Sequence, residues 1–162
     1  MSQPPALRPV AASIIPTQLL ELDTRRPQEL VDVTEPLAAL AASAGLTEGM
    51  LSAFCPHTSA GLAVTEAEEG LHADLADIFE HLAPAGRYWA HDDLARRRQN
   101  LVPGDRPNGH AHMRALLATL PQLSLPIVEG RLGLGEWQRV YLVELDGGRR
   151  RRLRVSAWGI PR

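Results

Sequence analysis

Short apolar blocks and apolar–polar alternation cover most of the chain, and this pattern predicts β-strands. The expected strands cover residues 17–23, 29–33, 50–55, 61–65, 123–128, 139–145 and 151–155. Thr24–Pro27 is typical of a turn between the first two strands. Asp146–Gly148 is typical of the turn of a β-hairpin. The chain is therefore expected to be rich in strands in both halves.

Three segments instead have the apolar period of an α-helix. The clearest, 68–83, places five apolar side chains on one face, namely Leu71, Leu75, Ile78, Phe79 and Leu82. Thr34 is expected to cap a helix that stops at Gly45, and Asn108 to cap one over 109–120. The irregular segment 88–109 is long enough to indicate a functional loop.

These elements predict an α+β fold. We expect a single compact domain over residues 14–162, with a strand-rich, sandwich-like core and about three helices. Residues 1–13 are rich in proline and are expected to form a flexible tail.

Composition narrows the functions that such a domain can have. The chain has 162 residues, of which 44% are hydrophobic, enough for a real core. Its net charge of -2 argues against general nucleic-acid binding. No apolar run approaches the length that spans a bilayer, so no membrane partner is expected. The single cysteine, Cys55, allows no disulfide within the chain, which fits a cytoplasmic protein, and it is expected to be a small core residue.

All 17 basic residues are arginines. Without lysine the chain has no Schiff-base chemistry, and an anion site must use arginine or backbone N–H groups. Arg131 follows Gly130 and is close to Gly133, so the backbone there can approach a ligand, although a salt bridge is the alternative. The run Arg149–Arg152 is expected to be a solvated edge of a hairpin.

Histidines recur at positions that look like loops or element ends. His57 lies in a small-residue turn between two apolar strands, Glu66 follows it, and His91, His110 and His112 come later. Such a set is typical of a metal site or an acid–base site. Glu66 could orient a histidine, bind metal or act as a base. The two other histidines, His72 and His81, belong to the helix over 68–83 and are left out of the site.

Five blocks of residues resemble a known family in their order and spacing. They are His57–Leu62 followed by Glu66 (HTSAGL-x-x-x-E), Asp74-Leu75, Leu82–Pro84 with Tyr88 and His91, Gly109–His112, and Pro126–Gln138 with its G-R-L-x-L-G core. Together they resemble the YjbQ-like family, also called the secondary thiamine-phosphate synthase enzyme family, over roughly residues 14–158.

The chain also departs from the family pattern. Thr65 stands where the family usually has Asn, and Glu136 replaces the usual Thr before Trp137. Asp105–Asn108 replaces an acidic run, and Arg96–Arg98 adds positive charge to the preceding loop. Fewer acidic neighbours would weaken any metal site that relied on them.

The resemblance implies a homotrimer with a histidine-lined metal site. It implies His57, His91 and His112 as ligands of a divalent metal ion such as zinc, with His110 beside them. Residues two apart on a helix diverge by about 200°, so only one of His110 and His112 can face such a site. Glu66 and Arg131 are the expected catalytic residues, one moving a proton or orienting a histidine, the other binding an anion.

The resemblance further implies a weak thiamine-phosphate synthase activity. That reaction joins a pyrimidine methyl diphosphate to a thiazole phosphate, so the expected partner is a small phosphorylated metabolite. The residues alone do not separate this transferase from a metal-assisted phosphate-ester hydrolase, or from a non-catalytic trimer that binds metal or metabolite.

Overall fold

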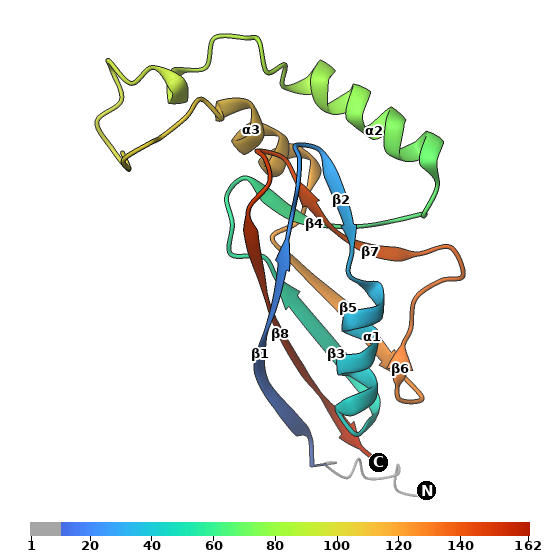
Figure 1. Cartoon of the computed structure of the whole chain (residues 1–162). Coiled ribbons are helices and arrows are strands. Elements are labelled where there is room, and N and C mark those ends of the chain that lie inside the picture. Colours follow the sequence, from blue (N-terminus) through green and yellow to red (C-terminus); the bar gives the residue numbers. More distant parts are fainter. Residues whose placement is uncertain (1–10) are drawn as a thin grey trace, which may run out of the picture.

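The alternating segments form two antiparallel sheets in the computed structural model, which describes residues 11–162 (Figure 1). The five-stranded sheet has the order β1 (Ser13–Asp23), β8 (Arg150–Pro161), β3 (Leu46–Phe54), β5 (Gln122–Val128) and β6 (Arg131–Leu132). The three-stranded sheet has the order β2 (Glu29–Asp32), β7 (Arg139–Glu144) and β4 (Ala60–Thr65).

Within residues 11–162, three α-helices and one short 3-10 helix accompany the sheets. They are α1 (Thr34–Ser43), α2 (Glu69–Leu82), η1 (Ala90–Asp92) and α3 (Gly109–Ala118). Helix α1 ends before Gly45, whose φ of +66° suits glycine at a helix C-terminus. The observed elements confirm the predicted α+β class with three α-helices.

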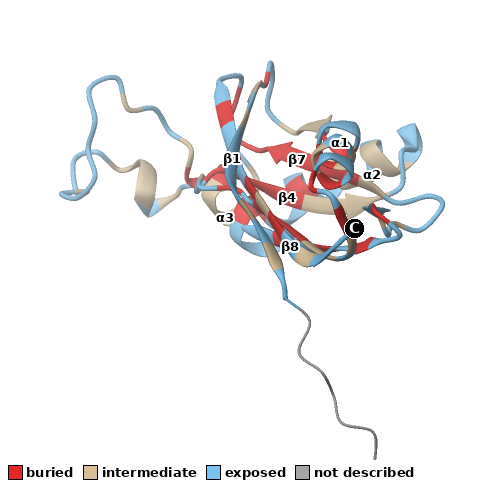
Figure 2. Cartoon of the chain, turned by 90° about the horizontal axis from the view of Figure 1, so that it is seen from below, coloured by how far each residue is buried: buried red, intermediate tan, exposed pale blue. Residues whose placement is uncertain are grey.

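Strand β7 organises the packing because it is buried on both faces. Val140 and Leu142 face the main core, which β3, β5, β8 and α1 also line. Tyr141 and Val143 face the other way, against Phe79 of α2 and two alanines of α3, Ala111 and Ala115. Figure 2 shows buried residues gathered in β4, β7, β8 and α3, while the irregular segment between α2 and α3 projects to one side and is largely exposed.

The prediction of a β-hairpin at Asp146–Gly148 is wrong. Strand β7 pairs with β2 and β4, whereas β8 pairs with β1 and β3, so the turn carries the chain from one sheet to the other. Strand β8 is thus internal to its sheet, and Arg149–Arg152 is not an edge. Arg151 is buried and forms an ion pair of 2.6 Å with Glu144, which the alternation of charged residues did not reveal.

Other boundaries also differ from the prediction. Ser13 already belongs to β1, and the rest of the expected tail, up to residue 10, lies outside the described residues. The short strand β6 was not predicted, because two residues carry no period. Thr34 begins α1 rather than capping it, and its hydroxyl accepts a hydrogen bond from Val140 N–H instead. None of the helices in residues 11–162 is long and apolar enough to cross a membrane.

Candidate functional site

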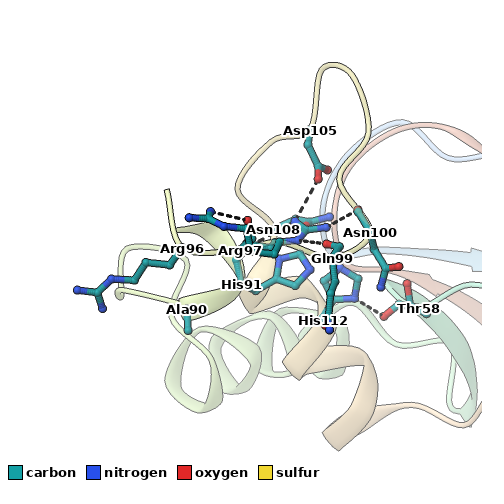
Figure 3. Close-up of a pocket in the computed structure, with 11 residues that line it drawn as sticks. Thr58, Ala90, His91, Arg96, Arg97, Gln99, Asn100, Asp105, Asn108 and His112 are labelled. Atoms are coloured by element: carbon teal, nitrogen blue, oxygen red, sulfur yellow. Dashed lines mark hydrogen bonds and ion pairs between the residues drawn. The ribbon is translucent and has the colours of Figure 1, made fainter. Parts of the chain in front are cut away.

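A cavity of about 930 Å³ opens where η1 and the projecting segment meet the start of α3 (Figure 3). Its walls are mostly polar and include three arginines; they comprise Thr58, Ala90, His91, Arg96, Arg97, Arg98, Gln99, Asn100, Asp105, Asn108 and His112. The imidazole rings of His91 and His112 lie side by side, with centroids 4.5 Å apart. The irregular segment and the Gly109–His112 block therefore line one cavity.

Asp92 joins the two elements that carry these histidines. Its Oδ1 accepts hydrogen bonds from the N–H groups of Asn108 and Gly109, at 2.9 and 2.8 Å, and so caps the N-terminus of α3. These bonds hold the pKa of Asp92 below its usual value, although burial opposes ionisation. Asn108 was expected to provide the cap, but its side-chain amide donates instead to Asp146.

Hydrogen bonds also decide which ring nitrogen each histidine offers. His112 Nδ1 lies 3.1 Å from the carbonyl oxygen of Thr58, which can only accept, so Nδ1 carries the proton. His91 Nδ1 lies 3.4 Å from the carboxylate of Asp92, and the same reasoning applies. In the neutral form of either ring, the lone pair then lies on Nε2. A histidine oriented by a carbonyl or a carboxylate in this way is typical of metal ligands.

The neutral form of His112 is favoured at its position. Burial of the ring and the nearby His91 keep the pKa of His112 below its usual value, against the opposing effect of the Thr58 carbonyl. A neutral imidazole can act as a metal ligand or a general base. His110, two residues before His112, lines neither this cavity nor the one beside it.

The three arginines of the cavity wall have different roles. Arg97 pairs with Asp105 at 3.1 Å and donates to the carbonyls of Gln99 and Asn100, so it holds the loop together. Arg96 is 82% exposed, and its side chain points away from the imidazoles (Figure 3).

Arg98 differs from both neighbours. It donates only to carbonyl oxygens, those of Ala95 and Arg97, and has no acidic partner among residues 11–162. Its positive charge therefore remains uncompensated at the cavity wall, where it can attract an anionic ligand.

His57 lies close to this site but outside the cavity. It lines a second cavity of about 330 Å³, which shares Thr58 and His112 with the first. Its Nε2 accepts a hydrogen bond of 2.9 Å from Arg152 N–H, so its remaining nitrogen carries a proton. Burial and the charge of Arg151 lower the pKa of His57.

His91 and His112 line one cavity, whereas His57 lines the neighbouring one and its Nε2 is engaged by Arg152 N–H. Within the part of the chain that the structure describes, no group of three or more His, Cys, Asp or Glu side chains is placed to hold a metal ion.

Glu66 and Arg131, the expected catalytic residues, lie at the other end of the strands. Glu66 follows the last residue of β4, whose first residue, Ala60, is near His57; six strand residues span roughly 20 Å. Arg131 pairs with Val128 at the far end of β5, whose near end, Gln122, pairs with Phe54. Figure 1 shows β6 and α3 at opposite ends of the molecule. A single chain does not bring these two residues to the histidines.

Sequence reasoning missed the residues that shape the cavity. Asp92 was given no role, Asn108 was predicted only as a helix cap, and Arg98 was noted only as a departure from a family pattern. Asn108 Oδ1 is buried without a hydrogen-bond partner in the described region and lines the cavity, so it offers an acceptor to a ligand. The run of three arginines after a histidine was the available signal for an anion site.

The amino-acid sequence of the chain is similar to those of a known protein family. The model of the family described as UPF0047 protein YjbQ-like matches residues 18–160. A UPF0047 protein of Methanothermobacter thermautotrophicus is 32% identical over 145 residues, which cover 90% of this chain and 93% of the relative. The UPF0047 protein YugU of Bacillus subtilis is 32% identical over 142 residues, which cover 86% of this chain and 97% of the relative.

Solved structures resemble the fold closely. A YbjQ-like protein of unknown function from Sulfolobus solfataricus superposes with a TM-score of 0.80 at 28% identity, covering 92% of this chain and 99% of the other. A hypothetical protein from Aeropyrum pernix gives a TM-score of 0.73 at 32% identity, covering 86% of this chain and 95% of the other.

Proposed function

Because the chain belongs to the UPF0047 family of YjbQ-like proteins, we propose that it is a metal-dependent enzyme that acts on a small phosphorylated metabolite. The arrangement that supports this proposal is the cavity of about 930 Å³, in which the uncompensated Arg98 and the paired imidazoles of His91 and His112 line the same space. Arginine suits phosphate, and imidazole nitrogens suit a divalent metal ion such as zinc.

The chain itself provides two of the metal ligands. His91 and His112 would hold the ion through Nε2, since their Nδ1 atoms are occupied by Asp92 and Thr58. His57 would be the third ligand after release of Arg152 N–H. A bound divalent ion would supply Lewis acidity toward a phosphate oxygen. Arg98 would bind the anionic group, and the segment 90–108 would screen it from water.

The reaction that the family resemblance suggests is the thiamine-phosphate synthase reaction. In it the pyrimidine methylene carbon loses diphosphate and forms a bond to the thiazole nitrogen. Arg98 would stabilise the departing diphosphate, since charge accumulates on its oxygens as the bond breaks. The expected homotrimer would let Glu66 and Arg131 of a neighbouring copy approach the cavity, which a single chain does not allow.

Metal analysis tests the first half of the proposal. The purified protein should contain close to one divalent ion per chain by elemental analysis, and His112→Ala should lose it. His81→Ala is the matched control, because His81 is exposed on α2 and bonds only the carbonyl of Asp77. Equal metal content in the two variants would refute His112 as a ligand.

Product analysis tests the second half. The protein with its metal should form thiamine phosphate from the two phosphorylated precursors, and His112→Ala should form much less than His81→Ala. Release of inorganic phosphate from phosphate esters would indicate a hydrolase instead. Metal and phosphate binding with no turnover of either kind would indicate a binding protein. Light scattering tests the homotrimer separately, and a monomer at micromolar concentration would contradict it.

A further inference from the structure

The second cavity adjoins the basic cavity and has the opposite chemistry. Apart from His57, Thr58 and His112, its walls come from Ala60, Ala115, Leu116, Thr119 and Pro121, contributed by β4, α3 and the turn after α3. Thr58 and His112 belong to both cavities. A ligand bound beside His112 can therefore extend from the basic cavity directly into the apolar one.

From this continuity we propose that the substrate carries an apolar group, about the size of one substituted ring, next to its phosphate, and that the second cavity binds this group. The inference rests on the proposed function for the anionic end of the substrate. It adds the chemical class of the rest of the molecule, namely an apolar phosphate ester rather than a sugar phosphate or a free phosphate.

Most residues of the second cavity wall are apolar apart from Thr119 and the residues around His57 and His112, and several of the polar atoms there already have partners within the chain. The hydroxyl of Thr119 donates to the carbonyl of Ala115 at 2.7 Å, within α3. His57 Nε2 accepts from Arg152 N–H, and His112 Nδ1 is bound to the Thr58 carbonyl. A hydroxyl-rich ligand would lose its bonds to water there and gain few in return, which is costly.

The volume also fits a single ring. A cavity of about 150 Å³ lined by apolar side chains holds benzene. The second cavity has about 330 Å³, so it has room for a ring with substituents but not for a long extended chain. Behind Thr119 the space is filled, because Gly61 packs directly against it and a Cβ at Gly61 would lie 2.0 Å from the Thr119 hydroxyl.

Leu116 forms the open wall of this cavity. It is 75% exposed, so its side chain has few contacts to lose and gains burial when an apolar group binds beside it. Leu117, the next residue of α3, is 60% exposed and lines neither cavity. The pair offers a matched comparison, since both truncations remove an exposed leucine from the same helix.

Titration of two phosphate esters tests the proposal. With the purified full-length protein and ligand-observed NMR, benzyl phosphate should bind about tenfold more tightly than methyl phosphate, the gain expected from burying a ring. Leu116→Ala should reduce this preference about threefold, and Leu117→Ala should leave it unchanged.

Each result has a distinct meaning. Equal affinity for the two esters would overturn the apolar subsite and leave the anion site intact. A preference for benzyl phosphate that falls equally in both leucine variants would place the ring elsewhere on α3 and also overturn it. Failure of both esters to bind would refute the proposed anion site, and the subsite with it.

Discussion

The polar and charged side chains are arranged differently at the two ends of the strands. At the end near α3, side chains surround two joined cavities, Asp92 and Thr58 fix the orientation of two imidazoles, and Arg98 keeps a free charge. At the other end, Arg131 and Glu66 are exposed and line neither cavity. The difference teaches that residues grouped by motif in one sequence need not meet in one chain.

A buried ion pair supports the end of the strands that carries His57. Behind the His57 turn, Arg151 and Glu144 form a buried ion pair, and Arg151 also donates to Ser59 at 3.1 Å. Glu144 in turn accepts from Thr24 and from the N–H groups of Asp146 and Gly147. Both carboxylate oxygens of Glu144 and the Nε and Nη2 atoms of Arg151 have partners, so the turn that carries His57 and Thr58 is held from within the core.

The largest expected effect concerns that buried pair. Glu144→Ala should lower the free energy of unfolding by about 3–5 kcal/mol, because it leaves the buried Arg151 guanidinium without its counter-ion. Urea denaturation followed by circular dichroism measures this. Asp23→Ala, which breaks the exposed pair with Arg150, is the control and should cause no measurable loss. A small effect of Glu144→Ala would show that the support is not localised in this pair.

A smaller effect compares the two ends directly. Arg98→Ala should weaken phosphate binding by about 2 kcal/mol, the scale of one charge-assisted hydrogen bond. If one chain forms the whole site, Arg131→Ala should leave the affinity unchanged. If a neighbouring copy brings Arg131 to the cavity, as the sequence-based prediction for Arg131 requires, its loss should cost a similar amount. Calorimetric titration with inorganic phosphate measures both variants.

The smallest expected effect is the dependence of the free energy of unfolding on pH. Burial opposes ionisation of Glu144, but hydrogen bonds from Arg151, Asp146 N–H and Thr24 prevail and hold its pKa below the usual value. A carboxylate with a lowered folded-state pKa stabilises the fold fully above the unfolded value of about 4.3. That stability is lost as the pH falls through the lower, folded-state pKa.

Unfolding free energies measured from pH 6 to pH 3 should therefore decline for the native protein. In Glu144→Gln the unfolding free energy should decline less over the same range, because an amide does not titrate. An identical slope in both proteins would assign the acid sensitivity to other carboxylates.

Much of the fold could be predicted from local pattern. The five apolar residues of α2, the stop at Gly45 and the apolar blocks of β3, β4 and β5 were read from a few neighbouring positions each. Arg151 was misread, because alternation places it on a strand face without saying which face is buried. The turn at Asp146–Gly148 was wrongly predicted to close a hairpin. A turn of this composition suits two strands that pair with each other and equally two strands that enter different sheets.

By itself, the sequence determined most of the strand and helix segments and the absence of lysine chemistry, because these depend on residue type and short spacing. Only the tertiary structure decided that His91 and His112 adjoin, that Asp92 and Thr58 orient them, and that Glu66 and Arg131 lie apart from them. Proximity between residues far apart in sequence depends on sheet order and register, and these are set by the packing of the whole core.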